Sequence, residues 1–412
     1  MTANSAEERD AARVRDGIRR AWLILGASFL AFTLSASVMH AYTVFLLAFT
    51  AEFGWSRAEA SIAYSVGQVV SGASSPLVGG MADRLGARRM MLLGGGLLAF
   101  GLVLSAFADA LWQVVVLYGV VMTLGANCIG MVVFVPLISR LFVARRGTAI
   151  AVLQSANGLG RAISAPAAQL LVSGIGWRGA YLAMAGGLAL LLPLAAQLPR
   201  REREPPANSG GAAASVREWA LAEAARTWQF WVLGLVYMLT SIGSFLVSLH
   251  QLAFAVGVGF DPLYAASVLG MGAFLALPGV IVTGALSDRI GREAAAVLTY
   301  FISMIGVAFA LFIDSPSQHW LFWLHACLFG VSWGARGPAI TAKTADLFPG
   351  PRLGTILGVI TIGSGLGAGL GSWAAGLLFD LTGDYRLGFW LSIAAYGLGS
   401  VAFWTLRRPV RH

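Results

Sequence analysis

The sequence predicts an all-α membrane protein with twelve transmembrane helices in two pseudo-symmetric six-helix bundles. Three observations lead to this prediction. Of the 412 residues, 58% are hydrophobic and 11% are charged, whereas soluble domains carry about 25% charged residues. Apolar runs long enough to cross a membrane recur along the whole chain. The second half of the chain also repeats landmarks of the first half in the same order.

The spans follow from hydropathy alone. A helix needs about 20 mostly apolar residues to cross a hydrocarbon core of about 30 Å. The expected spans are 22–49, 58–82, 90–108, 111–142, 148–172, 180–198, 230–256, 263–286, 294–313, 320–342, 355–379 and 387–406. Before the first span the chain is polar and has no short apolar run that ends at a cleavage site, so we expect no removable signal peptide.

One connection differs from the other, short ones. Residues 199–226 begin with a charged run and continue with Gly, Ala and Ser, a composition typical of a flexible linker. We therefore expect five segments, which are a cytoplasmic tail (1–21), an N-terminal six-helix bundle (22–198), a cytoplasmic linker (199–226), a C-terminal six-helix bundle (227–406) and a second cytoplasmic tail (407–412).

Basic residues predict the orientation. With the N-terminus inside, 23 of the 28 fall in inner segments and only Arg57, Arg178 and Arg386 in outer ones. This asymmetry predicts a multi-pass protein of the inner (plasma) membrane with both termini in the cytoplasm. The net charge of +9 is then a topology signal, and no nucleic-acid partner is expected. No Asp or Glu falls in the middle of a span, which argues against a proton relay through a buried carboxylate.

The internal repeat is clearest after the second and eighth spans. Residues 80–88 read Gly-Met-Ala-Asp-Arg-Leu-Gly-Ala-Arg, and residues 284–292 read Gly-Ala-Leu-Ser-Asp-Arg-Ile-Gly-Arg, about 205 positions later. Asp109 and Asp314 match at the same offset. Two repeated halves with the same orientation in the membrane form a parallel repeat. This repeat is typical of transporters in which the two halves rock around a substrate site between them.

The repeated loop resembles the signature of the major facilitator superfamily. The motif combines a tight turn at glycine, an acidic residue at a helix end and arginines that can bind neighbouring helices. The resemblance covers essentially the whole chain and implies a gate on the cytoplasmic side. The residues expected to form this gate are Gly80, Asp83, Arg84, Gly86, Arg88, Gly284, Asp288, Arg289, Gly291 and Arg292.

Three further patterns resemble the monocarboxylate porter and oxalate/formate antiporter branch of this superfamily. They are Phe-x-x-Arg-Arg-x-x-Ala at 142–149, Phe-Gly-Trp-Ser-Arg at 53–57 and Gly-Ala-Arg-Gly-Pro at 334–338. The branch implies a small organic anion as substrate. Many members carry an arginine in the eighth span, about two turns before the Asp-Arg motif. This chain has Pro278, Gly279 and Val280 there, so another arginine would have to bind the carboxylate.

Arg161 is the candidate replacement. It lies about 18 Å above the expected start of its span near Ala149, close to the membrane midplane, and its planar guanidinium matches a carboxylate. Gln154 and Asn157 share its helix face. The repeat places Ala368 at the equivalent position. The alternative is a structural arginine bonded to backbone carbonyls or packed where the halves meet.

Three more residues complete the expected substrate site. Tyr118 and His250 are polar side chains in the fourth and seventh spans. Arg336 lies in the inner third of the tenth span beside a Gly-Pro pair. There it is expected to bind the substrate, to close the cytoplasmic gate or to bond backbone carbonyls freed by the Gly-Pro break.

His40, His250 and His325 are the candidates for coupling to protons. They fall in the outer thirds of the first, seventh and tenth spans, and histidine titrates near neutral pH. The alternative for each is a hydrogen-bonded residue of the scaffold. The alternating glycines at 363–371 have no preceding strand and no Gly-Lys-Ser/Thr, so they indicate close helix contact and not a phosphate loop.

The expected function is secondary active transport of a small organic anion, foremost a monocarboxylate, by alternating access with proton symport or anion exchange. The expected partners are the anion, protons in the case of symport, and the lipid bilayer; the protein is expected to be a monomer without cofactor or metal. The alternatives are a polyspecific exporter of amphipathic compounds and a non-transporting membrane sensor. No nucleophile–base pair, metal-ligand cluster or ATP-binding loop supports an enzyme.

Overall fold

The computed structural model describes residues 3–142, 146–199, 219–334, 336–349 and 352–407, and within these ranges the regular structure is entirely helical. The helices of the N-terminal half are α1 (Ala3–His40), α2 (Tyr42–Phe53), α3 (Arg57–Leu85), α4 (Ala87–Ser105), α5 (Leu111–Val114), η1 (Val115–Met122), α6 (Thr123–Asn127), α7 (Met131–Leu141), α8 (Arg146–Gly187), η2 (Leu188–Leu190) and α9 (Leu191–Gln197). Those of the C-terminal half are α10 (Leu221–Ala224), α11 (Trp228–Ser248), α12 (Gln251–Val258), α13 (Pro262–Ile290), α14 (Arg292–Ala310), α15 (His319–Trp333), α16 (Arg336–Leu347), α17 (Leu353–Thr382) and α18 (Arg386–Thr405).

The all-α membrane fold is confirmed. In the described part of the chain, nine helical stretches are long and apolar enough to cross a membrane. One of them, residues 148–197, contains two spans joined at Gly176, whose φ of +72° produces a sharp turn. Two further spans bring the described helical segments to twelve. They are α3, which is more polar, and the pair α15 and α16, which together form one interrupted span. The boundaries of the five expected segments stay a prediction, because most of the linker lies outside the described residues.

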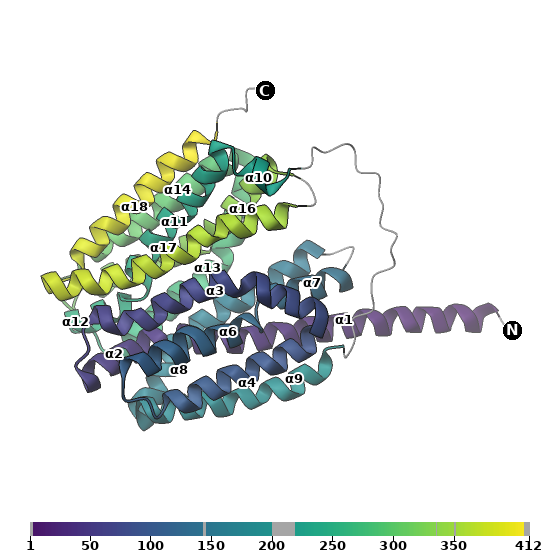
Figure 1. The fold of residues 1–412 in the computed structure, drawn as a ribbon, viewed down its shortest axis with the longest axis horizontal. Coiled ribbons are helices and arrows are strands. Elements are labelled where there is room, and N and C mark those ends of the chain that lie inside the picture. The colour runs from purple at the N-terminus through teal and green to yellow at the C-terminus, as the bar shows by residue number, and fades with distance from the viewer. Residues whose placement is uncertain (1–2, 143–145, 200–218, 335, 350–351, 408–412) are drawn as a thin grey trace.

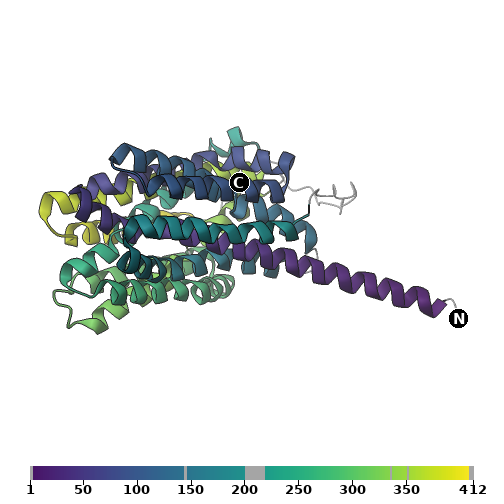
Figure 2. The same cartoon turned by 90° about the horizontal axis from the view of Figure 1, so that it is seen from below.

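The spanning helices pack into two groups, and the two ends of the bundle can be told apart by the helices they hold (Figure 1). One end of the bundle holds the start of α1 and the end of α18, and we call it the terminal side. The other end holds α2 and α12, and we call it the opposite side. Figure 2 shows the first turns of α1 extending beyond the bundle on the terminal side.

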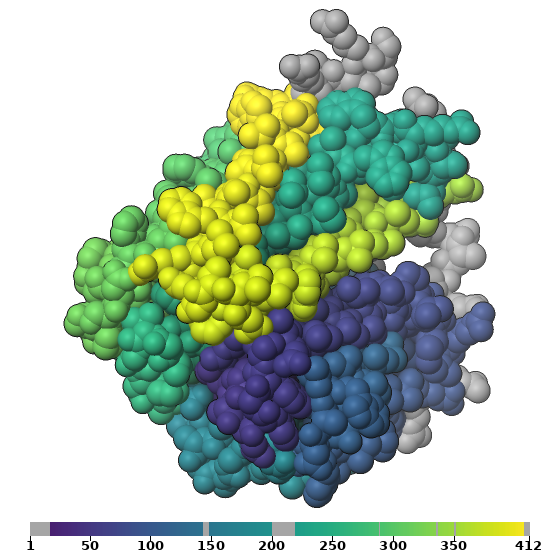
Figure 3. Space-filling view, turned by 60° about the vertical axis from the view of Figure 1, so that its left-hand side comes forward, coloured from purple at the N-terminus to yellow at the C-terminus, as the bar shows by residue number. Residues whose placement is uncertain are grey.

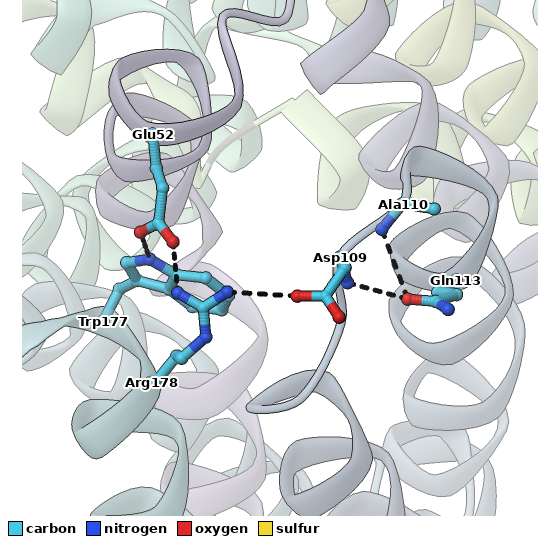
Figure 4. A network of polar contacts seen from close by, with 6 residues as sticks. All are labelled: Glu52, Asp109, Ala110, Gln113, Trp177 and Arg178. Carbon is cyan, nitrogen blue, oxygen red and sulfur yellow. Dashed lines mark hydrogen bonds and ion pairs between the residues drawn. The ribbon is translucent and has the colours of Figure 1, made fainter.

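A polar cluster ties the spans of the N-terminal half together on the opposite side (Figure 4). Gln113 Oε1 accepts hydrogen bonds from the backbone N–H groups of Asp109 (2.8 Å) and Ala110 (3.2 Å). Arg178 Nη2 lies 3.3 Å from Asp109 Oδ1, and Arg178 also pairs with Glu52. The carboxylate of Glu52 accepts a further hydrogen bond from the Trp177 indole N–H.

The C-terminal half repeats the Asp, Gln and Arg contacts of this cluster. Gln318 Oε1 accepts from the backbone N–H groups of Asp314 (2.7 Å) and Ser315 (3.2 Å), and Arg386 pairs with Asp314. Each contact lies about 205 residues after its counterpart, so the two halves use equivalent residues to fix equivalent loops. The pseudo-symmetry therefore extends to individual side-chain contacts.

Helix α17 presents glycines on two faces. A Cβ atom built at Gly367 would lie 2.3 Å from the carbonyl oxygen of Met238 on α11, and one built at Gly376 would lie 2.5 Å from the carbonyl oxygen of Arg57 on α3. Larger residues would force both neighbours away. The glycines at 363–371 all lie close to the backbone of a neighbouring helix, so the prediction that they permit close helix contact is confirmed. Through α17 the C-terminal half contacts the N-terminal half directly.

Asp380, near the end of α17, caps a helix of the other half. Its Oδ1 accepts from the N–H of Arg57 (2.8 Å) and its Oδ2 from the N–H of Ala58 (2.7 Å), at the start of α3. Within α3, Ser56 and Glu59 form a capping box. The first four N–H groups of a helix have no partner inside it; here the box satisfies two of them and Asp380 satisfies the other two.

The halves are joined most closely on the opposite side. Contacts between α3 and α17 run from the Asp380 cap to Gly72 and Gly365, near the middle of both helices. Figure 3 shows the segments around residue 50 packed against those around residue 380. Toward the terminal side the ribbons of α3 and α17 diverge (Figure 1), and Leu77 on α3 is 72% exposed.

The repeated loops expected to form a gate lie on the terminal side. Gly86 (φ +78°) and Gly291 (φ +92°) adopt the backbone conformation that favours glycine and link α3 to α4 and α13 to α14. Arg292 Nε lies 3.7 Å from Asp346 at the end of α16. This ion pair joins two helices of the C-terminal half, α14 and α16. The side chain of Asp288 lies outside the described part.

Candidate functional site

A pocket lies between the two halves. It is formed where the first span of each half is interrupted, at Ala41 between α1 and α2 and at Leu249–His250 between α11 and α12. Such interrupted helices commonly form substrate sites in transporters. The pocket is lined by His40, Thr43, Tyr64, Arg161, Ser164, Ala165, Ser248, Gln251, Leu252, Leu269, Gly270, Ala273 and Trp333.

Arg161 is the charged residue of this lining. Its side chain extends from α8 toward the C-terminal half, and its Cζ lies 3.8 Å from the centre of the Trp333 ring. A guanidinium over an indole face is attracted by the ring quadrupole, most strongly when both are shielded from water. Trp333, at the end of α15, packs in turn against Phe245 on α11, with ring centres 5.2 Å apart. The contact fixes Arg161 across the boundary between the halves.

Close approach of the backbones positions Arg161. Gly160, next to it, lies so near α1 that a Cβ atom there would come within 2.6 Å of the carbonyl oxygen of Thr33. A Cβ atom at Gly270 on α13 would likewise lie 2.4 Å from the carbonyl oxygen of Ala162. Arg161 is therefore held between α1 and α13, on a helix with little freedom to shift.

His40 lies at the end of α1, in the same pocket, and its ring interacts with the side chain of Asn157 and with the charge of Arg161. One turn beyond Arg161, Ser164 also lines the pocket. The predicted polar face of α8 thus contributes Arg161 and Ser164 to the lining and brings Asn157 to His40. Gln154 lies on α8 toward the terminal side, exposed and outside the lining.

His250 lies beside the pocket, in an interface between spans. Its Nε2 is 3.1 Å from Ser61 Oγ on α3 and 3.0 Å from the carbonyl oxygen of Ser372 on α17. Its Nδ1 is 3.3 Å from the hydroxyl of Tyr385. The structure therefore places His250 in a buried polar contact between the halves, outside the pocket lining.

Tyr118 and His325 also lie outside the lining. The Tyr118 hydroxyl donates to the carbonyl oxygen of Met39 (2.8 Å), one residue before His40. His325 Nδ1 lies 2.8 Å from the carbonyl oxygen of Gly306, between helices of the C-terminal half. Arg336 begins α16, and its side chain falls outside the described residues.

Sequence reasoning missed several lining residues that come from the C-terminal half. Trp333 and Gln251 are the most informative of them. Gln251 is the residue after His250, so a polar pair in an apolar span was a usable signal. No comparable signal in the sequence pointed to Trp333, because tryptophan in a span usually faces lipid or the membrane interface. Tyr64 on α3 completes the aromatic part of the pocket.

Comparisons with known proteins agree with this architecture. Residues 22–342 match the model of the Major Facilitator Superfamily. The chain is 28% identical to rat Monocarboxylate transporter 13, over 93% of the chain and 88% of the relative. It is 27% identical to human Monocarboxylate transporter 11, over 94% and 83% of the two chains.

A solved structure shares the fold. The crystal structure of a mutant of the nucleoside transporter NupG superposes with a TM-score of 0.73 at 14% identity, covering 94% of this chain and 100% of the other. The matches to monocarboxylate transporters confirm the resemblance inferred from the sequence motifs. This chain belongs to the major facilitator superfamily and is a membrane transporter related to the monocarboxylate transporters.

Proposed function

We propose that the protein transports a small organic monocarboxylate by alternating access, with the carboxylate bound to Arg161. The observation that carries this proposal is the composition of the pocket between the halves. Its thirteen lining residues include one arginine and no Asp or Glu. A cation in a membrane cavity favours an anionic ligand, and guanidinium matches a carboxylate in shape.

The composition of the pocket favours a small anion over a bulky amphipathic compound, because Arg161 and several hydroxyl groups line it. Apolar residues such as Leu252, Leu269 and Ala273 line the same pocket and suit a short hydrocarbon tail. A second carboxylate would meet no second arginine among the described lining residues, which favours monocarboxylates over dicarboxylates.

We propose His40 as the proton site if transport is coupled to protons. Of the three candidate histidines, His40 is the one in the pocket lining, beside Arg161. A proton on His40 and the charge of Arg161 repel each other at this short range. A bound carboxylate neutralises Arg161 and removes most of that repulsion. Proton and anion would therefore bind together, which is the requirement for symport.

The test is uptake by the purified protein in liposomes, measured across mono- and dicarboxylates with and without a pH gradient. Arg161→Gln should abolish carboxylate uptake, and Arg161→Lys should retain part of it, because lysine keeps the charge but loses the planar fork. Wild-type rates in a folded Arg161→Gln protein would reject the anion site. Stimulation by a proton gradient would indicate symport, and acceleration by anion on the far side without pH dependence would indicate exchange.

We further propose an inner (plasma) membrane location with the terminal side in the cytoplasm. The support is the arginine distribution, because the loops on the terminal side carry most of the basic residues and such loops stay on the cytoplasmic side. Reporter fusions at each terminus, active only in the cytoplasm, test this orientation. Activity of both fusions is expected, and inactivity of either would contradict it.

A further inference from the structure

Gln251 is a buried amide at the interruption of the seventh span. It is the first residue of α12, it lines the same pocket as residues of α8, and it is 8% exposed. Its Oε1 accepts no hydrogen bond from any residue in the described ranges. Most buried polar atoms of proteins are paired, so this oxygen needs an explanation.

An unpaired amide oxygen in a buried position costs free energy. An apolar residue of similar length, such as methionine, would fill the same space without that cost. The terminal torsion of glutamine is broad and roughly two-fold, so the amide can turn its oxygen toward the pocket. In that orientation a donor on a bound molecule can supply the missing hydrogen bond.

We propose that Gln251 selects carboxylates that carry a neutral hydrogen-bond donor, such as a hydroxyl or an amide N–H, over analogues without one. This inference rests on the proposed binding of the carboxylate at Arg161. Arg161 and Gln251 belong to opposite halves and line the same pocket. A single small molecule can therefore bind the arginine through its carboxylate and the amide through its donor.

The charge of the pocket decides the kind of donor. An ammonium group would also satisfy Gln251 Oε1, but it would enter a lining that holds one arginine and no Asp or Glu. An unpaired second cation in such a place is costly. A hydroxyl or amide adds no charge, so neutral donors are favoured over amino groups.

Closure of the halves strengthens the selection. While the pocket is open, water can hydrogen-bond the amide and little is gained from a substrate donor. When the halves close around the substrate, water is excluded, and a substrate without a donor leaves the oxygen unpaired. Sites built to hydrogen-bond a substrate hydroxyl discriminate strongly against the analogue that lacks it.

The experiment compares matched substrates in liposomes that contain the full-length protein. The pairs are 2-hydroxybutyrate with butyrate and 3-hydroxybutyrate with butyrate, and 2-aminobutyrate tests the charged donor. The wild type should favour the better hydroxy acid over butyrate by about tenfold in uptake efficiency, the usual effect of a buried hydrogen bond. It should disfavour the amino acid.

Gln251→Met removes the amide and keeps the length of the side chain, so the preference for the hydroxy acid over butyrate should fall to about twofold or less. The matched control is Gln169→Met, the same change on α8 outside the pocket lining, which should keep the wild-type preference. Because the wild-type preference is measured directly, the proposal remains testable even if Gln251→Met fails to fold.

The outcomes separate this proposal from the one on which it rests. Uptake of butyrate and both hydroxy acids at equal efficiency by the wild type, or an unchanged preference in Gln251→Met, would overturn the role of Gln251 and leave the carboxylate site intact. Absence of all carboxylate uptake would overturn both. Loss of the preference in Gln251→Met alone supports the selection.

Discussion

The Asp380 cap leads to a quantitative prediction about how the halves separate. Asp380 belongs to the C-terminal half but satisfies two N–H groups at the start of α3, at 2.8 and 2.7 Å. In a conformation open on the opposite side these groups must separate. The cap therefore stabilises the closed opposite side relative to the open one.

The magnitude follows from the contacts that Asp380→Ala removes. Loss of a helix cap costs typically about 1 kcal/mol, and loss of a negative charge near a helix N-terminus costs up to about 1 kcal/mol more. A combined loss of about 2 kcal/mol corresponds to a change of about 30-fold in the ratio of open to closed molecules, since about 1.4 kcal/mol is a factor of ten.

The assay is a distance distribution between two spin labels on the opposite side, one at Ile175→Cys in the N-terminal half and one at Ser317→Cys in the C-terminal half. Both positions are exposed, and the natural Cys128 and Cys327 would first be replaced by serine. Asp380→Ala should increase the population at the longer distance at the expense of the shorter one.

Asp384→Ala is the matched control. Asp384 is a second carboxylate at the same end of the C-terminal half, and its described contacts are with Arg386 and Thr382 of that half. Its removal should leave the distance distribution unchanged. A shift of less than about threefold in Asp380→Ala, or an equal shift in Asp384→Ala, would refute the reasoning.

Three further predictions follow from the pocket and the helix contacts. Trp333→Leu should raise the KM for carboxylates about tenfold, because a shielded cation–π contact with Arg161 is worth about 1–2 kcal/mol; Trp333→Phe should give an intermediate KM in the same uptake assay, and an unchanged KM would contradict the contact. His40→Gln should remove any stimulation of uptake by a proton gradient while exchange of anions continues, and persistent stimulation would exclude His40 as the proton site. Gly376→Val should destabilise the closed opposite side, since its Cβ would lie 2.5 Å from the carbonyl oxygen of Arg57; an unchanged label distance distribution would show that the helices tolerate the larger side chain.

Hydropathy and the repeat predict most of the fold, because the membrane imposes both the length and the helical form of each span. Part of the site was also predictable. An arginine in an apolar span has few stable environments, so its spacing with Asn157 and Ser164 identifies a polar face. His40 could be proposed because few residues of the chain titrate near neutral pH.

The rest of the site depends on how the halves meet, which the local sequence does not encode. The interruption of the seventh span turns Gln251 toward the pocket and His250 toward Ser61 and Ser372. Their adjacency in sequence gives no means of telling which one faces the substrate. From the sequence alone, Asp380 is an ordinary acidic residue near an outer loop. Its role as a helix cap becomes visible only when α3 of the other half is placed against it.

The glycines of α17 also affect how this helix is maintained. Eight of its thirty residues are glycine, and each glycine costs roughly 0.8–1 kcal/mol relative to alanine in a water-exposed helix. Compared with a helix that has alanine at these positions, the isolated α17 helix would therefore be less stable in water by several kcal/mol. In a bilayer, unsatisfied backbone groups are far more costly, so the lipid environment supplies the helical stability that this sequence lacks. The segment can thus combine a narrow, nearly smooth surface with a regular backbone, but only after insertion into the membrane.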